Sequence, residues 1–357
     1  MNKRIALVAG GTGGHIYPAV SLAKEMIKKG YQITFIGAND RMEKDVIPNL
    51  GFEFIGLDVK TTRGGLLQKF KSLFSMIHSY HQCIKLLKGK YDLVMGFGNY
   101  ISVPVVLAAK HLGIKTVIHE QNSFVGRANR LLDEKVDLVI ASYPNSLAQF
   151  KNSKAVVLGN PQSSVAKMVK KDPNVIKDLG LNPDKKTVVI FMGSLGSESV
   201  LKIILDYFKL LNDFDYQIIY ATGVKHYAKA KDYGNEQIKI FDKIKGAEVM
   251  VNADLLVSRA GATTLAEITA LGTPSILIPS PYVPNNHQFY NAKALVDNQA
   301  AIMLEEKDLN AEKLKELIEG LLNDNQRRLT IGQNARNMAV DNAIEDIIGK
   351  VEELWNL

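Results

Sequence analysis

The sequence predicts an α/β protein with two Rossmann-like halves in tandem, each containing a parallel sheet. Short apolar strands alternate with helical patterns along most of the chain. Each half opens with a strand followed by a glycine turn, first at 3–14 and again at 187–196. The length of 357 residues exceeds what one hydrophobic core usually supports, which also indicates two domains.

In the first half, Lys3–Ala9 predicts a buried strand and Gly10–Gly14 a tight turn. Apolar spacing predicts a helix over Ile16–Lys29, with Gly30 at its C-cap. Further strands are expected at Tyr31–Ile36, Phe52–Leu57, Leu93–Gly96, Thr116–His119 and Leu138–Ala141. Helical patterns between most of these strands favour a doubly wound sheet.

Val157–Pro161 marks a break, and a polar, lysine-rich stretch follows it. The pattern then restarts with a strand at Thr187–Met192, a turn at Gly193–Gly196 and a helix at Glu198–Leu211. Later strands are expected at Gln217–Ala221, Ile238–Phe241, Leu255–Ser258, Ser275–Ile278 and Ala301–Leu304. We therefore expect an N-terminal domain at 1–160, joined by a helix at 341–357, and a C-terminal domain at 161–340.

The composition limits the possible partners and compartments. A net charge of +7 and a pI near 9.1 favour anionic partners, namely nucleic acid, phosphorylated ligands or anionic lipid. Dispersed lysines and the lack of a recognised motif argue against nucleic acid. Cys83 is the only cysteine, which excludes an intramolecular disulfide and fits a reducing cytoplasm. No apolar stretch approaches the roughly 18 residues of a membrane span, so we expect any membrane contact to be peripheral.

The loop Gly10–His15 lies between a predicted strand and a predicted helix. Its glycines let the backbone approach a ligand, and the helix start offers N–H groups to an anion. A dinucleotide loop or a plain turn explains the loop equally well, although its spacing is not G-x-G-x-x-G. His15 has the chemistry of a general base near neutral pH, and the alternative is a capping or packing histidine.

Three later segments have residue types that suit a phosphorylated sugar. Gly193–Ser197 is a second strand-turn-helix loop, in which the Ser194 hydroxyl can meet a phosphate, and a plain turn explains it equally well. Ser258–Glu267 combines a strand end, a small-residue turn and a helix start, which suits a diphosphate. Glu267, one turn later, suits a ribose diol, and the alternative is a charge on the helix surface. Pro279–Ala292 contains Asn286, His287, Gln288 and Asn291, which can reach a sugar. Asp213-Phe214-Asp215 has a metal-binding D-x-D form, but its position predicts a surface turn.

The chain resembles the MurG family of bacterial glycosyltransferases. The similar segments are GGTGGHIYPA at 10–19, GFGNYISVPV at 96–105, HEQNSFVGRAN at 119–129, GNP at 159–161, RAGATTLAE at 259–267 and NNHQFYNA at 285–292. They occur in the family's order and span both halves. Six ordered motifs are far more specific than a single glycine loop.

This resemblance implies a GT-B fold, in which two Rossmann-like domains face each other across a cleft. It implies inverting transfer of N-acetylglucosamine from UDP-N-acetylglucosamine to the C4 hydroxyl of the muramyl sugar of lipid I, giving lipid II for peptidoglycan synthesis. It also implies that the chemistry needs no metal or other cofactor, and that the protein acts at the cytoplasmic face of the cell membrane.

The resemblance also implies site residues. The expected donor-site residues are Thr12, Gly13, Gly14, Asn122, Ser194, Ala262, Thr263, Thr264, Leu265, Ala266, Glu267 and Gln288. Glu267 would hold the ribose and Gln288 the sugar hydroxyls, and the uracil would meet the backbone near Lys243 and Ile244. His15, Glu120 and Tyr100 would face the acceptor, with His15 the first choice for the base and Glu120 the second. Ser163 departs from the family, which often has arginine there.

Arg63–Lys90 combines apolar and basic residues at helical spacing. It suits either a core-packed helix with a solvated basic face or an amphipathic surface on anionic lipid. Other readings of the whole chain are a transferase with another lipid acceptor, a UDP-sugar epimerase, or a nucleotide-binding regulator without turnover. Transfer of labelled sugar to a lipid I analogue distinguishes these readings.

Overall fold

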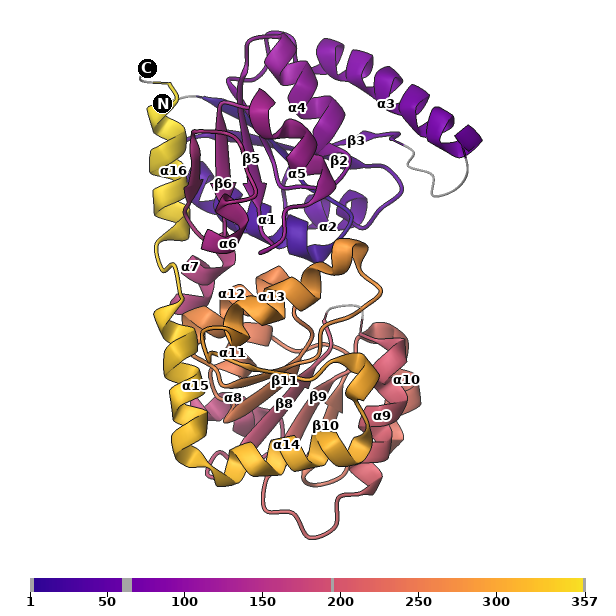
Figure 1. The fold of residues 1–357 in the computed structure, drawn as a ribbon, viewed down its shortest axis with the longest axis vertical. Coiled ribbons are helices and arrows are strands. Elements are labelled where there is room, and N and C mark those ends of the chain that lie inside the picture. The colour runs from indigo at the N-terminus through magenta and orange to yellow at the C-terminus, as the bar shows by residue number, and fades with distance from the viewer. Residues whose placement is uncertain (1–2, 60–65, 194–195, 356–357) are drawn as a thin grey trace. The chain divides into compact units, whose positions relative to one another are not determined.

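The computed structural model confirms the predicted α/β class, with two compact units that are each built on one parallel sheet (Figure 1). Unit 1 comprises Met1–Gln162 and Asn342–Leu357, and unit 2 comprises Ser163–Asp341. The structure describes residues 3–59, 66–193 and 196–355, and for 66–74 it describes the backbone alone.

Unit 1 contains a seven-stranded sheet with the order β3-β2-β1-β4-β5-β6-β7, and all neighbouring strands are parallel. Its strands are β1 (Arg4–Val8), β2 (Gln32–Ala38), β3 (Glu53–Leu57), β4 (Leu93–Gly96), β5 (Lys115–Glu120), β6 (Leu138–Ala141) and β7 (Ala155–Val157). The predicted strands are all confirmed. β7 escapes the sequence prediction because it is only three half-buried residues long.

The helices of unit 1 are α1 (Gly13–Lys28), α2 (Glu43–Asn49), α3 (Leu66–Leu87), α4 (Ser102–His111), α5 (Arg127–Leu132), η1 (Asp133–Lys135), α6 (Pro144–Leu147) and α16 (Ala343–Glu353). They cover both faces of the sheet, and β1 shows the consequence. Ile5 and Leu7 pack in a cluster with α1 and α16, whereas Ala6 and Val8 pack with α4. Because both faces are buried, β1 is a continuous apolar run in the sequence.

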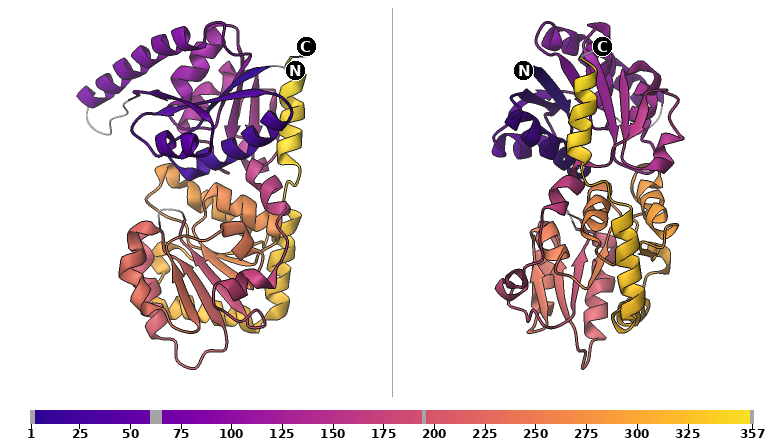
Figure 2. Two further views of the ribbon diagram at one scale, coloured as in Figure 1. Left: turned by 180° about the vertical axis from the view of Figure 1, so that it is seen from behind. Right: turned by 90° about the vertical axis from the view of Figure 1, so that its left-hand side faces the viewer.

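Helix α16 belongs to unit 1, although unit 2 separates it from the rest of that unit in the sequence. Its inward face adds five side chains to the cluster beside α1, namely Ile344, Ile347, Ile348, Val351 and Leu354. The Tyr31 hydroxyl donates to Glu352 at 2.7 Å, and the Tyr31 ring stacks on Trp355. Figure 2 shows α16, in yellow, beside the strands of unit 1.

Unit 2 contains a six-stranded parallel sheet with the order β10-β9-β8-β11-β12-β13. Its strands are β8 (Thr187–Phe191), β9 (Gln217–Ala221), β10 (Ile238–Phe241), β11 (Leu255–Ser258), β12 (Ser275–Leu277) and β13 (Ile302–Met303). Its helices are α8 (Pro173–Asp178), α9 (Glu198–Lys209), α10 (Val224–Ala230), η2 (Lys231–Tyr233), α11 (Gly246–Met250), α12 (Ala262–Leu271), η3 (Pro284–Asn286), α13 (His287–Val296), η4 (Glu306–Asp308), α14 (Ala311–Asn323) and α15 (Asn325–Asn337). Helix α7 (Pro161–Lys167) passes from unit 1 into unit 2.

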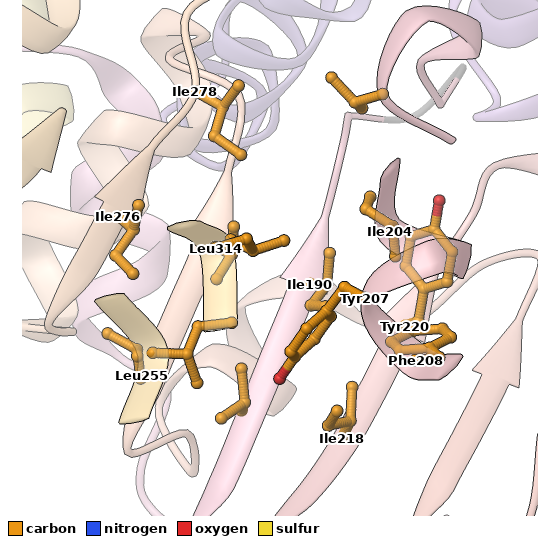
Figure 3. Packing of buried hydrophobic residues seen from close by; sticks show 14 of the residues in the cluster. Ile190, Ile204, Tyr207, Phe208, Ile218, Tyr220, Leu255, Ile276, Ile278 and Leu314 are labelled. Carbon is orange, nitrogen blue, oxygen red and sulfur yellow. The ribbon is translucent and has the colours of Figure 1, made fainter. Parts of the chain in front are cut away.

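The core of unit 2 lies between the sheet and helices α9 and α14 (Figure 3). Ile190 and Ile218 from the strands meet Tyr207 from α9 and Leu314 from α14. The buried Tyr207 hydroxyl lies 2.9 Å from the hydroxyl of Tyr216, so each polar tip has a partner inside the apolar cluster. This packing fixes the strands whose ends carry the candidate site.

Both sheets are doubly wound, and each has a point where the strand order reverses. In unit 1 that point lies between β1 and β4, and in unit 2 it lies between β8 and β11. In open α/β sheets, ligands bind outside the carboxyl ends of the strands at such a point. The loops after β1, β4, β8 and β11 are therefore the first places to look for a site.

We predict that Ile347→Ala destabilises unit 1 by about 2–4 kcal/mol, because the change leaves a cavity between α16 and α1. Ile347 is fully buried. Urea unfolding followed by the fluorescence of Trp355, the only tryptophan, checks this. The matched control is Glu345→Ala on the exposed face of α16, which we expect to change stability by about 0.5 kcal/mol or less. Equal effects of the two changes would contradict the packing described here.

Candidate functional site

In unit 1, the predicted site residues gather at the carboxyl edge of the sheet. They lie at the end of β5 or follow β1, β4 and β5, and are Thr12, Gly13, Gly14, His15, Tyr100, Glu120 and Asn122. β1 pairs directly with β4, and β4 pairs directly with β5. Parallel pairing therefore places three loops that are distant in the sequence side by side.

Helix α1 begins at Gly13, three residues before the predicted start, so the predicted turn over Gly10–Gly14 is too long. The first turn of a helix needs no apolar side chain, and apolar spacing therefore does not reveal it. Thr12 is the N-cap, but its side chain makes no capping bond, and the first turn contains no acidic residue. The glycines thus supply backbone N–H groups and the positive end of the helix dipole, a combination that suits an anion.

His15 is held by the glycine loop through one ring nitrogen. Its Nδ1 lies 3.2 Å from the carbonyl oxygen of Gly10 and 3.2 Å from the hydroxyl oxygen of Thr12. A carbonyl oxygen can only accept, so we assign the hydrogen of the neutral ring to Nδ1. The lone pair that can take a proton is then on Nε2, as a general base requires.

Glu43 is a positioning residue that the sequence does not reveal. Its carboxylate is fully buried and accepts from the backbone N–H of Gly11 at 2.9 Å and of Ala38 at 3.0 Å. A Cβ at Gly10 would lie only 2.1 Å from the same carboxylate, so this position requires glycine. Glu43 therefore fixes the backbone that carries His15. An acidic residue in the first turn of a short helix gives no sequence signal for this role.

Tyr100 follows β4 in a loop that bonds to the glycine loop. Asn99, at a φ of 69°, donates from its side-chain amide to the Gly10 carbonyl at 2.8 Å and accepts from the Tyr100 backbone N–H. Partial burial raises the pKa of Tyr100 above its ordinary value, although a hydrogen bond with Arg41 opposes that rise. The phenol is therefore protonated at neutral pH and suits hydrogen bonding to a sugar rather than proton abstraction.

Glu120 is buried, with 2% exposure, and its carboxylate accepts four hydrogen bonds from residues of unit 1. One oxygen accepts from the backbone N–H and the side-chain amide of Asn122, both at 3.0 Å. The other accepts from the Gly126 backbone N–H and from the Asn129 amide, both at 2.9 Å. This carboxylate folds the loop 120–129 around itself, which favours a positioning role for Glu120.

In unit 2, a second group of predicted residues lies after β11. Ala262, Thr263, Thr264, Leu265, Ala266 and Glu267 form the first two turns of α12. Its N-cap, Gly261, makes no side-chain capping bond, and the first turn contains no acidic residue. By contrast, α8, α14 and α15 are capped by the side chains of Asp172, Asn310 and Asp324. The start of α12 therefore retains the N–H groups and dipole that suit a phosphate.

Gln288 lies in the first turn of α13, beside this helix start. Its amide oxygen accepts from the Ser280 backbone N–H at 2.8 Å, which leaves its amide nitrogen as the donor for another partner. Asn291, fully buried, donates to the carbonyl oxygen of Ala260 at 3.1 Å and so ties α13 to the loop after β11. This bond gives Asn291 a role in positioning α13, and its contact with a sugar stays a prediction.

Arg259 has a structural role in this region that the sequence does not assign. Its guanidinium is buried, pairs with Glu306 at 2.7 Å and donates to the Ile278 carbonyl at 3.0 Å. It also donates to the hydroxyls of Ser197 and Ser199, at 2.5 and 3.1 Å. These bonds join the start of α9 to the ends of β11 and β12.

Several further residues that the sequence singled out fall within the residue range of unit 2. Of these, Ser194 lies outside the described residues. Ser163 is buried and donates to the Val340 carbonyl at 2.6 Å, within unit 2. Lys243 and Ile244 lie in the loop between β10 and α11. Asp213 and Asp215 are both exposed in a turn, as predicted. Among the described residues, no group of three or more His, Cys, Asp or Glu side chains has a metal-binding arrangement.

Arg63–Lys90 is helical from residue 66 to residue 87, as α3. Its first residues, 63–65, lie outside the described part, and the side chains of 66–74 are not described. The C-terminal part packs on α4 through Cys83 and Leu87, which are fully buried. None of the described helices has the length and apolar character required to cross a membrane.

Two family models match this chain, one within unit 1 and one over most of unit 2 and the start of α16. Residues 5–141 match the glycosyltransferase family 28 N-terminal domain, and residues 187–347 match its C-terminal domain. The chain also resembles the crystal structure of MurG from Acinetobacter baumannii, with a TM-score of 0.79 and 27% identity over 98% of this chain and 99% of that one. The chain shares its fold with a putative UDP-N-acetylglucosamine 2-epimerase from Listeria monocytogenes, with a TM-score of 0.68 over 100% of this chain and 97% of that one. The identity of 15% means that this likeness shows the fold alone.

Similar sequences include proteins named UDP-N-acetylglucosamine–N-acetylmuramyl-(pentapeptide) pyrophosphoryl-undecaprenol N-acetylglucosamine transferase. The protein from Pediococcus pentosaceus is 38% identical over 96% of this chain and 97% of its own length. That from Caldanaerobacter subterraneus is 40% identical over 94% and 95%, and that from Bacillus subtilis is 36% identical over 98% and 99%. This extent of identity, together with the matches in both units, shows that the chain belongs to the MurG family of family 28 glycosyltransferases.

Proposed function

We propose that this protein transfers N-acetylglucosamine from UDP-N-acetylglucosamine to the C4 hydroxyl of the muramyl sugar of lipid I, with inversion, giving lipid II for peptidoglycan synthesis. The observation that carries the proposal is the sequence identity of 36–40%, over 94–98% of this chain, to proteins that are named as N-acetylglucosamine transferases. The test is an assay with labelled UDP-N-acetylglucosamine and a lipid I analogue. Binding of the nucleotide sugar without any transfer would support a nucleotide-binding regulator instead.

In this proposal, unit 2 binds most of the donor. The backbone N–H groups of Ala262–Thr264 hold the diphosphate, because this helix start lacks both a capping side chain and an acidic residue. Glu267, one turn further along α12, accepts the ribose hydroxyls, and the amide nitrogen of Gln288 donates to the donor sugar. The helix dipole then stabilises the negative charge of the departing UDP.

Unit 1 supplies the acceptor side and the base. His15 Nε2 takes the proton of the attacking hydroxyl, while the oxygen's electron pair forms the bond to the anomeric carbon. The bond from that carbon to the phosphate oxygen breaks, and UDP leaves with its electron pair. Nδ1–H stays on the Gly10 carbonyl throughout, so that carbonyl stabilises the imidazolium. Tyr100 and Asn122 lie at the same sheet edge for contacts to the sugars.

Glu120 remains the alternative base, but its geometry supports a positioning role. Its two oxygens accept four hydrogen bonds from within the loop 120–129. Taking up a proton would break at least one of these bonds, and the carboxylate is 2% exposed. His15 meets the requirement of an accepting ring nitrogen without such a loss.

We predict that His15→Ala lowers kcat about 10²–10⁴-fold, because the attacking hydroxyl loses its general base. UDP affinity, measured by calorimetry, should change little, since unit 2 binds the nucleotide in this proposal. The control is His111→Ala, which removes an exposed histidine at the opposite end of α4 from the site and should keep normal turnover. Normal turnover in His15→Ala would instead identify Glu120 as the base.

We predict that Glu267→Gln weakens UDP binding about 10–100-fold, because a charged acceptor of the ribose hydroxyls becomes a neutral one. Titration calorimetry with UDP measures this change without requiring turnover. Glu316→Gln, on the exposed face of α14, serves as the control and should bind UDP as the unmodified protein does. Unchanged affinity in Glu267→Gln would remove the ribose contact from the proposal.

We also propose that the protein associates peripherally with the cytoplasmic face of the cell membrane through α3. The support is the basic and apolar composition of the segment 63–90, together with an acceptor that is linked to a lipid. Cys83 and Leu87, near the C-terminal end of α3, pack against α4. We therefore propose that the N-terminal turns of α3 meet the lipid headgroups.

Reversing the charge of Lys69 and Lys71 should reduce recovery with anionic vesicles in a flotation assay, because each basic residue near such a surface contributes about 1 kcal/mol. The control reverses Lys225 and Lys313, two exposed lysines of unit 2, and gives the same net charge. Equal recovery on neutral and anionic vesicles, unaffected by the change in α3, would exclude this docking surface.

A further inference from the structure

Gln121 contains a buried polar group that the proposed mechanism does not use. The side chain is 1% exposed, and its Oε1 has no hydrogen-bond partner among the described residues. An unpaired buried acceptor loses its hydrogen bonds to water without replacing them, and such groups are rare in folded proteins. Its position, one residue after Glu120 and at the edge that carries His15, suggests a role in the site.

The orientation of this amide is fixed by a chain of hydrogen bonds through His119. The Nε2 of His119 lies 3.0 Å from the Gly159 carbonyl oxygen, which can only accept, so Nε2 carries the hydrogen. Full burial lowers the pKa of His119 to about 4, although the bond to Gly159 opposes this, so the ring is neutral at physiological pH. Its Nδ1 is therefore an acceptor.

The amide nitrogen of Gln121 donates to that Nδ1 at 3.0 Å and to the His119 carbonyl oxygen at 3.2 Å. Neither atom can donate in return, so the amide has a single allowed orientation. The ring of Phe97 stacks on His119, with centroids 5.3 Å apart, and holds the imidazole in place. The unpaired Oε1 is thus directed away from His119.

Gln121 Oε1 and His15 border the same small space above Gly98. A Cβ at Gly98 would lie 3.7 Å from Oε1 of Gln121 and 3.4 Å from Nε2 of His15. Gly98 has a φ of 78°, which also favours glycine, so the space contains no side chain from this position. In the neutral tautomer assigned above, His15 Nε2 is an acceptor, and two acceptors do not bond to each other.

We propose that Gln121 is a positioning residue for the transfer reaction: its buried Oε1 places a partial negative charge near His15, and this charge stabilises the imidazolium that forms when Nε2 takes the proton of the attacking hydroxyl. This inference rests on the proposed function and its choice of base. No hydrogen bond joins Oε1 to His15 in the structure, so the stabilisation acts across the space above Gly98 that both groups border. The gain occurs only after proton transfer begins, so it favours the transition state over the ground state.

Two substitutions of Gln121 should move the basicity of His15 in opposite directions. Gln121→Met removes the acceptor at similar size, so we expect the pKa of His15 to fall by about half a unit or more. Gln121→Glu puts a carboxylate there and should raise it. The other titratable or charged groups at this edge, Glu43, Tyr100, Arg41, Asp40, His119 and Glu120, are retained in both variants.

The primary measurement is an NMR titration of the His15 imidazole in the full-length protein and in both variants. It requires no turnover, so it separates failure of this inference from failure of the proposed function, which the lipid I assay tests. In that assay, the acid limb of kcat/KM should move to lower pH in Gln121→Met and to higher pH in Gln121→Glu. We expect the plateau kcat of Gln121→Met to fall about tenfold with little change in UDP affinity.

The matched control is Gln149→Met, which loosens the same loop without facing His15. Gln149 donates to the carbonyls of Ser123 and Asn145 and accepts from the Val125 backbone N–H. It should leave the titration of His15 unchanged. The inference is overturned if the pKa of His15 is the same in both Gln121 variants as in the unmodified protein, or if Gln149→Met changes it as much as Gln121→Met does.

Discussion

Parallel strand pairing is the constraint on which the rest of this structure depends. In each unit the central strand has parallel neighbours on both sides, so that every strand ends at the same edge of its sheet. The helix that follows each strand therefore begins at that edge, with unpaired N–H groups and the positive end of its dipole. Residues far apart in the sequence, such as His15, Tyr100 and Glu120, meet there without any long-range signal in the sequence.

Buried polar side chains convert this edge into a defined shape. Glu43 holds the loop after β1, Glu120 holds the loop after β5, and Arg259 with Glu306 holds the region around β11. Glu43 and Glu120 are compensated by hydrogen bonds and Arg259 and Glu306 by their ion pair, as burial in a low-dielectric interior requires. None of these four side chains has to touch a substrate to affect catalysis, because each one sets the position of residues that do.

The sequence predicts the strands well because a strand buried on both faces is a continuous apolar run, as in β1 and β8. It places the start of α1 three residues too late, because glycines in a first helical turn carry no apolar signal. It does not reveal Glu43 or Arg259, whose partners are backbone groups or residues at least 32 positions away, including Gly11 and Ser197. The roles of His15 and Glu120 and their order of preference are predicted from the resemblance. The tautomer of His15 and the burial of Glu120, which support that order, require coordinates.

Helix α16 gives unit 1 a discontinuous sequence, and this affects how the protein folds during synthesis. Unit 2 is encoded entirely between the two parts of unit 1, so its sheet can close while the chain is still growing. The cluster beside α1 lacks Ile344 to Leu354 until synthesis has passed unit 2, and its apolar face stays exposed for that time. We therefore expect the unit that carries the proposed base to become stable last, and to have the greater need for protection from aggregation on the ribosome.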